Sequence, residues 1–91
     1  MNFEWDENKN RININKHGVS FQIASRVFRD ENVLIFPDEF HSTDEDRSFA
    51  IGMVGRLLYV VFTERTDAIR LISARRANKM EEMLYEENLY T

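Results

Sequence analysis

The sequence predicts an α+β domain in which helices pack against an antiparallel sheet. Three observations carry this prediction. Two segments with helical signals open the chain, four segments of strand-like composition follow, and a further helical segment comes last. Strands that follow one another through short loops are usually antiparallel. With 91 residues and no linker rich in glycine or proline, the chain is predicted to form one domain over residues 1–91.

The helical signals of the first third are capping residues and a periodic apolar pattern. Asp6 is a candidate N-cap for a helix that runs to about Lys16, and Gly18 suits the left-handed position after its end. Ser20 is a second N-cap, and the amphipathic segment "FQIASRVFRDE" follows it. These signals predict two helices joined by a short turn. The preceding "NFEWD" fits either a short strand or an extended entry, with Phe3 and Trp5 as core side chains.

Four segments in the middle of the chain have strand composition, namely 32–37, 47–54, 57–62 and 68–75. The run "LLYVVF" at 57–62 is continuously apolar, which predicts a central strand buried on both faces. The polar "FHSTDEDR" at 40–47 predicts a turn, with His41 in solvent, and "ERTDA" predicts a hairpin loop before the last strand. The last helix is predicted over 77–90, where Met80 and Met83 form either core or a partner groove.

Composition and charge exclude several classes of function. The chain has no cysteine, which excludes disulfides and thiolate metal sites, and its two histidines are too far apart for a typical zinc site, so we expect no metal or cofactor. A net charge of −4 argues against generic nucleic-acid binding, although residues 65–80 hold five basic side chains against one acid. No apolar run could span a bilayer, and no signal-peptide pattern is present, so we expect a cytoplasmic protein.

Several motifs resemble the BrnT family of bacterial type II toxins. They are "FEWDENKNRININKHGVSF", "VFRD", "EDRSFAIGMVGRLLYVVFTERTDAIRLISARRA" and "EEMLYEE". The similarity runs over about residues 3–87, and "IRLISARRA" is more specific than the short "KHG". The order and spacing of these motifs together carry the resemblance.

The resemblance implies a small endoribonuclease with a RelE-like fold. It also implies a cognate BrnA-like antitoxin with a ribbon–helix–helix DNA-binding domain. The complex would repress its own promoter, so that DNA is contacted only through the complex. Because a ribbon–helix–helix domain is dimeric, a 2:2 toxin–antitoxin assembly is expected. No membrane partner is expected.

Metal-free RNA cleavage needs a base for the 2′-OH proton, positive charge on the phosphate and an acid for the leaving oxygen. Arginine suits the second role because its planar fork matches two phosphate oxygens. We expect Arg47 and Arg75 to bind phosphate, since both lie at strand ends that can converge in an antiparallel sheet. Arg76 ends the same strand as Arg75. Arg65, in the loop before the last strand, can reach the same substrate or lie at the opposite edge.

The base and the acid stay open among four side chains. Glu64, His17 and Lys16 are candidate bases, and Tyr85 is a candidate acid or a stacking ring. Structural alternatives stand beside them. The imidazole can simply cap a helix, the phenol can face the core, and Arg75 can pair with a helix acid such as Glu82.

Two further hypotheses compete with an active ribonuclease. The chain can be an inactive relative that serves only as antitoxin partner and co-repressor. It can also be an unrelated α+β interaction domain. Toxicity in the absence of the antitoxin separates the active ribonuclease from the inactive relative. Tight binding of an antitoxin encoded beside the chain excludes the unrelated interaction domain.

Overall fold

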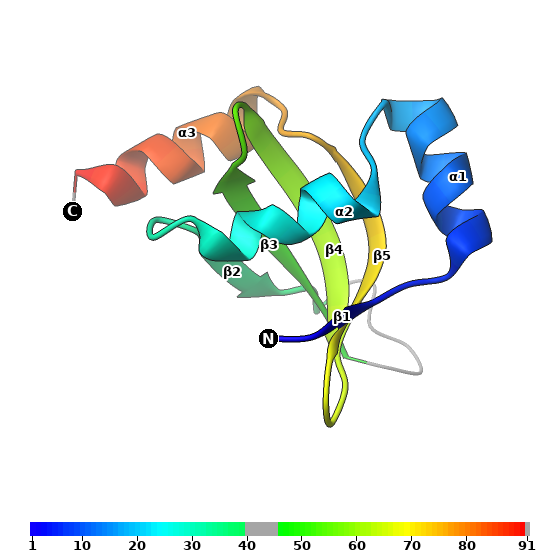
Figure 1. Ribbon diagram of the computed structural model, residues 1–91. Helices are drawn as coiled ribbons and strands as arrows, with labels where there is room; N and C mark the ends of the chain where they lie inside the picture. Colours follow the sequence, from blue (N-terminus) through cyan, green and yellow to red (C-terminus); the bar gives the residue numbers. More distant parts are fainter. Residues whose placement is uncertain (40–45, 91) are drawn as a thin grey trace.

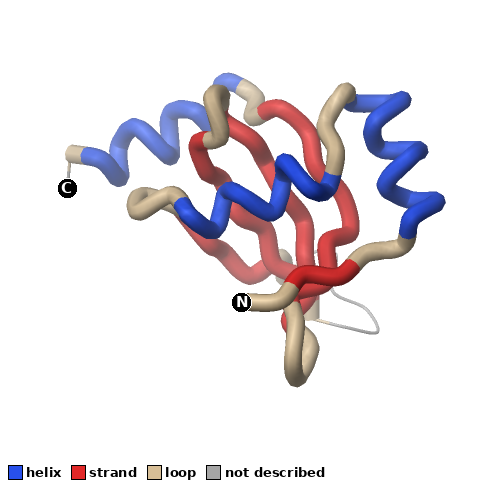
Figure 2. The backbone as a smooth tube through the Cα atoms, in the orientation of Figure 1, coloured by secondary structure: helices blue, strands red, loops and turns tan. Residues whose placement is uncertain are grey.

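A computed structural model describes residues 1–39 and 46–90 of the chain, and it has an α+β architecture (Figures 1 and 2). Its elements are β1 (Phe3–Glu4), α1 (Glu7–His17), α2 (Phe21–Ala24), the 3₁₀ helix η1 (Ser25–Arg29), β2 (Leu34–Pro37), β3 (Arg47–Met53), β4 (Leu57–Glu64), β5 (Ile69–Arg76) and α3 (Lys79–Leu89). The predicted class is confirmed, and the architecture is compatible with a RelE-like fold. The predicted position of His41 and most of the predicted turn lie outside the described residues. In the ranges that are described, no helix is long and apolar enough to cross a membrane.

The five strands have the order β1-β5-β4-β3-β2. The four predicted strands are all present and pair antiparallel, as expected. The predicted four-stranded sheet is one strand short, because "NFEWD" supplies β1, which pairs in parallel with β5. Of the two possibilities left open for this segment, the short strand is therefore correct.

The capping residues act as the sequence predicts. The Asp6 carboxylate accepts hydrogen bonds from the N–H groups of Asn8 and Lys9, and Gly18 ends α1 with φ 69°. Ser20 accepts from the N–H of Ile23. The second helix differs from the prediction, because it tightens from α2 into η1 instead of continuing as one α-helix.

The tightened turn brings η1 very close to the sheet. A Cβ placed on Gly52 of β3 would lie 2.8 Å from the Cβ of Val27. Only a glycine permits this approach without displacing one of the two backbones.

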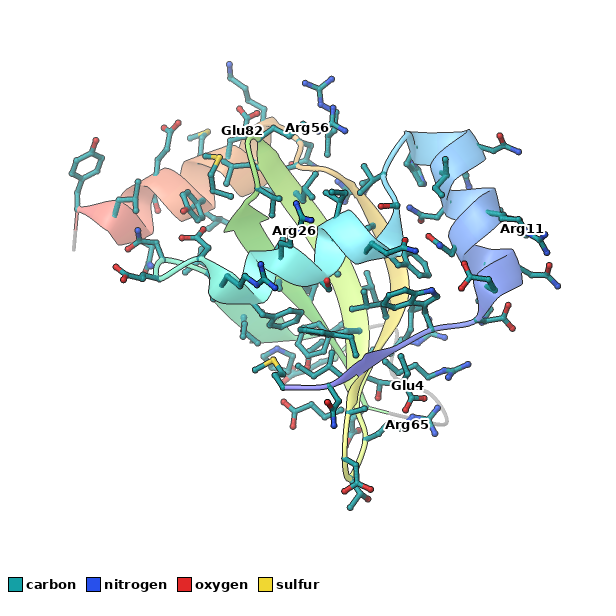
Figure 3. All side chains as sticks on the ribbon, in the orientation of Figure 1. Glu4, Arg11, Arg26, Arg56, Arg65 and Glu82 are labelled. Atoms are coloured by element: carbon teal, nitrogen blue, oxygen red, sulfur yellow. The ribbon has the colours of Figure 1, made fainter. Side chains whose placement is uncertain are left out.

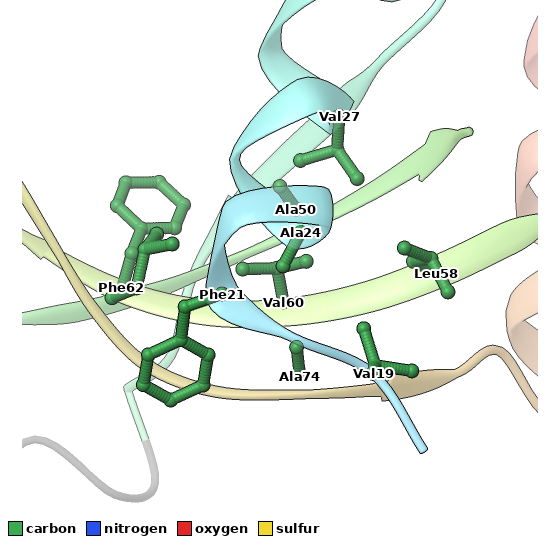
Figure 4. Packing of buried hydrophobic residues seen from close by; sticks show 10 residues of the cluster. Val19, Phe21, Ala24, Val27, Ala50, Leu58, Val60, Phe62 and Ala74 are labelled. Carbon is green, nitrogen blue, oxygen red and sulfur yellow. The ribbon is translucent and has the colours of Figure 1, made fainter. Parts of the chain in front are cut away.

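One face of the sheet is covered by α2 and η1. The main core lies between these two helices and the sheet (Figure 4). Its buried members are Val19, Phe21, Ala24, Val27, Ala50, Leu58, Val60, Phe62, Leu71 and Ala74. The prediction that β4 is buried on both faces is wrong. Its alternate residues Leu57, Tyr59 and Val61 are only half-buried. The reason is that α3 crosses only one end of the second face, behind the sheet in Figure 1.

The rest of that second face is the surface on which the candidate site lies. We call it the open face. Strand alternation and register place on it Phe36, Arg47, Phe49, Tyr59, Val61, Ser73 and Arg75.

The backbone hydrogen-bonding groups at the edge of β5, past the end of β1, are paired by a side chain of α1. Asn13 is 6% exposed, and its Nδ2 donates to the carbonyls of Val19 and Ala74, both at 2.8 Å. Its Oδ1 accepts from the Ala74 N–H at 3.1 Å. Asn13 thus replaces the neighbouring strand that β1 is too short to provide, and it fixes α1 beside β5 (Figure 2).

Candidate active site

Arg75 is a basic side chain that several contacts hold on the open face. Its Nη1 and Nη2 each donate to one carboxylate oxygen of Glu81, both at 2.9 Å. Nη1 also donates to the Arg76 carbonyl at 3.1 Å, and the guanidinium carbon lies 4.1 Å from the centre of the Tyr59 ring. The hydrogen bonds to Glu81 are the largest cause that raises the pKa of Arg75. The guanidinium is therefore charged and held in one orientation.

Glu81 was not among the predicted site residues. The expected structural alternative was a pair between Arg75 and Glu82, but the partner is Glu81, one residue earlier. Glu81 also forms a capping box with Asn78, in which each side chain accepts from the other residue's N–H at 2.9 Å. One carboxylate thus starts α3 and orients Arg75. The capping-box pattern in "NKME" was the signal that could have identified it.

A row of aromatic rings crosses the open face and ends at Arg75. The ring centres of Phe36 and Phe49 are 5.2 Å apart, and those of Phe49 and Tyr59 are 5.1 Å apart. The Phe49 and Tyr59 rings are stacked, the Phe36 ring is tilted by 33° against Phe49, and the Arg75 guanidinium lies over the Tyr59 ring. Burial, followed by the charge of Glu81, raises the pKa of Tyr59, which keeps its phenol neutral at physiological pH. The row forms a stiff support beneath Arg75.

A groove of about 200 Å³ lies between α1 and β5. It is lined by Lys9, Ile12, Asn13, Lys16, His17, Ile72 and Ser73. Ser73 and Arg75 are two residues apart on the same side of β5, about 7 Å along the strand. The structure therefore brings the predicted residues Lys16, His17 and Arg75 to one side of the molecule, and Lys9 adds a further positive charge there.

Arg47 does not converge with Arg75. In the sheet register Arg47 lies opposite Thr63, whereas Arg75 lies opposite Tyr59. These positions are about 13 Å apart along the strands and two strands, or about 10 Å, apart across the sheet. The expectation failed because β3 and β5 run in the same direction, so that the start of one and the end of the other lie at opposite ends of the sheet.

Glu64 and Arg65 lie at the Arg47 end. Together with Met1, Asn2, Asp67, Ala68 and Ile69 they line a groove of about 310 Å³. Figure 3 places Arg65 at the lower end of the molecule near Glu4, whereas Arg56 and Glu82 lie at the upper end. Of the two possibilities left open for Arg65, the structure supports the opposite edge. Arg76 is exposed, and strand alternation directs its side chain away from the open face.

Tyr85 has the position expected of a structural residue. It is 5% exposed, and its hydroxyl donates to Oδ2 of Asp30 at 2.6 Å. Burial, together with this hydrogen bond, raises the pKa of Tyr85 to about 12. The phenol connects α3 to the end of η1, and its hydroxyl proton is used in the hydrogen bond to Asp30.

Three other expectations can be compared with the structure. Phe3 and Trp5 pack against the core, as predicted. Met80 and Met83 are not core residues, because they are 67% and 51% exposed. Across the described residues, no group of three or more His, Asp or Glu side chains has the arrangement of a metal site.

One family model matches most of the chain. A family model described as "Ribonuclease toxin, BrnT, of type II toxin-antitoxin system" matches residues 5–81. The matched range contains every predicted site residue except Tyr85. Among curated proteins, no match was found. Because the model matches most of the chain, the protein belongs to the BrnT family of ribonuclease toxins of type II toxin–antitoxin systems.

Proposed function

We propose that this ribonuclease toxin cleaves RNA on the open face, with Arg75 as the phosphate ligand. One observation carries the proposal. Glu81 and Tyr59 hold the Arg75 guanidinium in place on the open face, and Ser73, two residues earlier on the same side of β5, lines a groove together with three basic side chains. Glu81 occupies the edge formed by Nη1 and Nη2. The other edge, formed by Nε–H and the second Nη2–H, remains for two oxygens of one phosphate.

The proposed reaction needs no metal. A base removes the proton of the RNA 2′-OH, the 2′-oxygen forms a bond to phosphorus, and the bond from phosphorus to the 5′-oxygen breaks. The leaving 5′-oxygen takes a proton, so the products carry a 2′,3′-cyclic phosphate and a 5′-OH. His17 and Lys16 are the proposed proton-transfer residues, because they line the same groove as Ser73, which precedes Arg75 by two residues on β5. Arg75 stabilises the extra negative charge on the phosphate.

A type II toxin implies a cognate antitoxin. We propose that this partner is a BrnA-like ribbon–helix–helix protein, that the complex is 2:2, and that it represses its own promoter. The net charge of −4 supports a division of roles in which the antitoxin contacts DNA. Light scattering on the co-purified complex, with a promoter mobility shift, tests this proposal. A complex of another stoichiometry, or one that does not bind the promoter, would contradict it.

The catalytic proposal is tested by cleavage of a labelled single-stranded RNA in EDTA. Arg75→Ala should lower the rate about a hundredfold or more, because it removes the charged donor. Arg75→Lys keeps the positive charge but loses the planar fork, so its cleavage rate should lie between those of the wild type and of Arg75→Ala. Arg26→Ala is the matched control, since Arg26 is an exposed arginine of η1 on the other side of the sheet (Figure 3).

Circular dichroism checks that each variant is folded. If folded Arg75→Ala cleaved RNA at the wild-type rate, the assignment of Arg75 as the phosphate ligand would be refuted. If no protein cleaves free RNA, the assay is repeated with ribosomes and with expression in cells that lack the antitoxin. Absence of toxicity there would identify an inactive binding module instead of an enzyme.

A further inference from the structure

The outer edge of β2 has backbone groups that face away from the sheet. Asp38 N–H donates to the carbonyl of Arg47, its direct opposite in the antiparallel register, at 2.8 Å. Hydrogen-bonded pairs alternate along such a ladder, so Leu34 and Phe36 bond to β3. The N–H and the carbonyl of Ile35 therefore point outward, where no described strand lies. Pro37, which has no N–H to donate, limits this edge to one short pairing site.

This edge is only partly protected against pairing with another strand. Leu34, Ile35 and Phe36 carry no charge, and Ile35 is 51% exposed. Edge strands in monomeric proteins are commonly protected by short length, proline or charged side chains, and β2 has the first two, because it has four residues and ends at Pro37. Its apolar residues 34–36 carry no charge, so this short stretch can still pair with another chain.

A groove runs beside the same edge. It has a volume of about 220 Å³ and is lined by Leu34, Phe36, Leu84, Glu87 and Asn88. A second groove of about 270 Å³ continues along α3 and is lined by Met83, Glu86, Glu87 and Tyr90. Both are apolar with an acidic rim.

The negative potential of this rim is increased by the helix itself. The last turn of α3 has no basic residue, although a helix C-terminus favours positive charge. A partner side chain with positive charge would therefore be attracted here. A second copy of the chain would instead bring the same glutamates together.

We propose that an extended segment of the cognate antitoxin pairs with β2 at Ile35, places an apolar side chain in the groove at Leu84 and sets a basic side chain beside Glu87. The inference rests on the proposed antitoxin partnership and not on the catalytic assignment. Binding and cleavage are therefore measured separately on the same variants.

The test uses the full chain and its purified cognate antitoxin. Ile35→Pro removes the outward N–H, and Glu87→Lys reverses the charge of the rim. Each should weaken antitoxin binding about tenfold or more, while RNA cleavage stays unchanged. Met80→Lys is the matched control, because Met80 is an exposed apolar residue of the same helix that lines neither groove.

Hydrogen exchange on the wild-type complex gives a readout that does not depend on a variant's folding. The Ile35 amide should exchange fast in the free chain and slowly in the complex. Unchanged exchange, or unchanged affinity in both folded variants, would overturn the proposal. A dimer of the free chain that Ile35→Pro converts to monomer would also overturn it and would identify a second copy as the occupant.

Discussion

Asn13→Ala is the sharpest test of how the fold holds α1 and its groove in place. The side chain is almost fully buried and makes three hydrogen bonds, all to backbone groups. Alanine has no polar atom to replace them, so one amide and two carbonyls lose a partner.

The expected cost follows from these contacts. Each lost hydrogen bond costs about 1 kcal/mol, or about 3 kcal/mol for the three. Alanine has a higher helix propensity than asparagine, which returns about 0.5 kcal/mol. The free energy of unfolding should therefore fall by about 2.5 kcal/mol, and the midpoint temperature by roughly 10–20 °C for a domain of this size.

Urea unfolding followed by Trp5 fluorescence and by circular dichroism measures this loss. Asn15→Ala is the control, because Asn15 is an exposed asparagine of the same helix, and its replacement should be neutral or slightly stabilising. A loss below about 1 kcal/mol for Asn13→Ala, close to the control, would refute the view that Asn13 substitutes for a missing strand.

Two other substitutions test the connections around the sheet. Tyr85→Phe should cost about 1–2 kcal/mol by removing the hydrogen bond to Asp30, and RNA cleavage per folded molecule should not change. The pKa of Tyr85 is about 12 in the folded protein, above its usual value of about 10. The stabilisation from this residue should therefore be fully present below about pH 10 and be lost as the pH rises toward 12, whereas Tyr85→Phe should lack this pH dependence. The same alkaline stability profile for both proteins would contradict a structural hydrogen bond from Tyr85 to Asp30. Gly52→Ala should cost about 1–3 kcal/mol in thermal unfolding, because its Cβ meets Val27, and an unchanged midpoint would show that η1 can yield.

The sequence was sufficient for elements that depend on local signals. Asp6, Gly18 and Ser20 mark helix ends, and their side chains or backbone act through neighbours only a few residues away. The β-rich segments likewise gave four strands in the right order. Such signals need no knowledge of the tertiary structure.

Features that depend on contacts distant in sequence were missed. Asn13 forms hydrogen bonds with Ala74, 61 residues away in the sequence. The periodic spacing of apolar residues identifies buried apolar side chains but cannot identify a buried asparagine. The separation of Arg47 from Arg75 follows from strand direction and register, which composition does not encode. The extent of α3 over the sheet decided which face of β4 is open.

Binding of RNA to the open face beside Arg75 can be tested with a 2′-O-methyl RNA, which cannot be cleaved. This RNA is titrated into ¹⁵N-labelled protein, and the shifts of the amide signals are mapped onto the structure. We predict that the largest shifts lie at Lys16, His17, Ser73 and Arg75, and that they weaken as salt is added. Shifts confined to the Arg65 loop or to the α2 side of the sheet would contradict this assignment of the site.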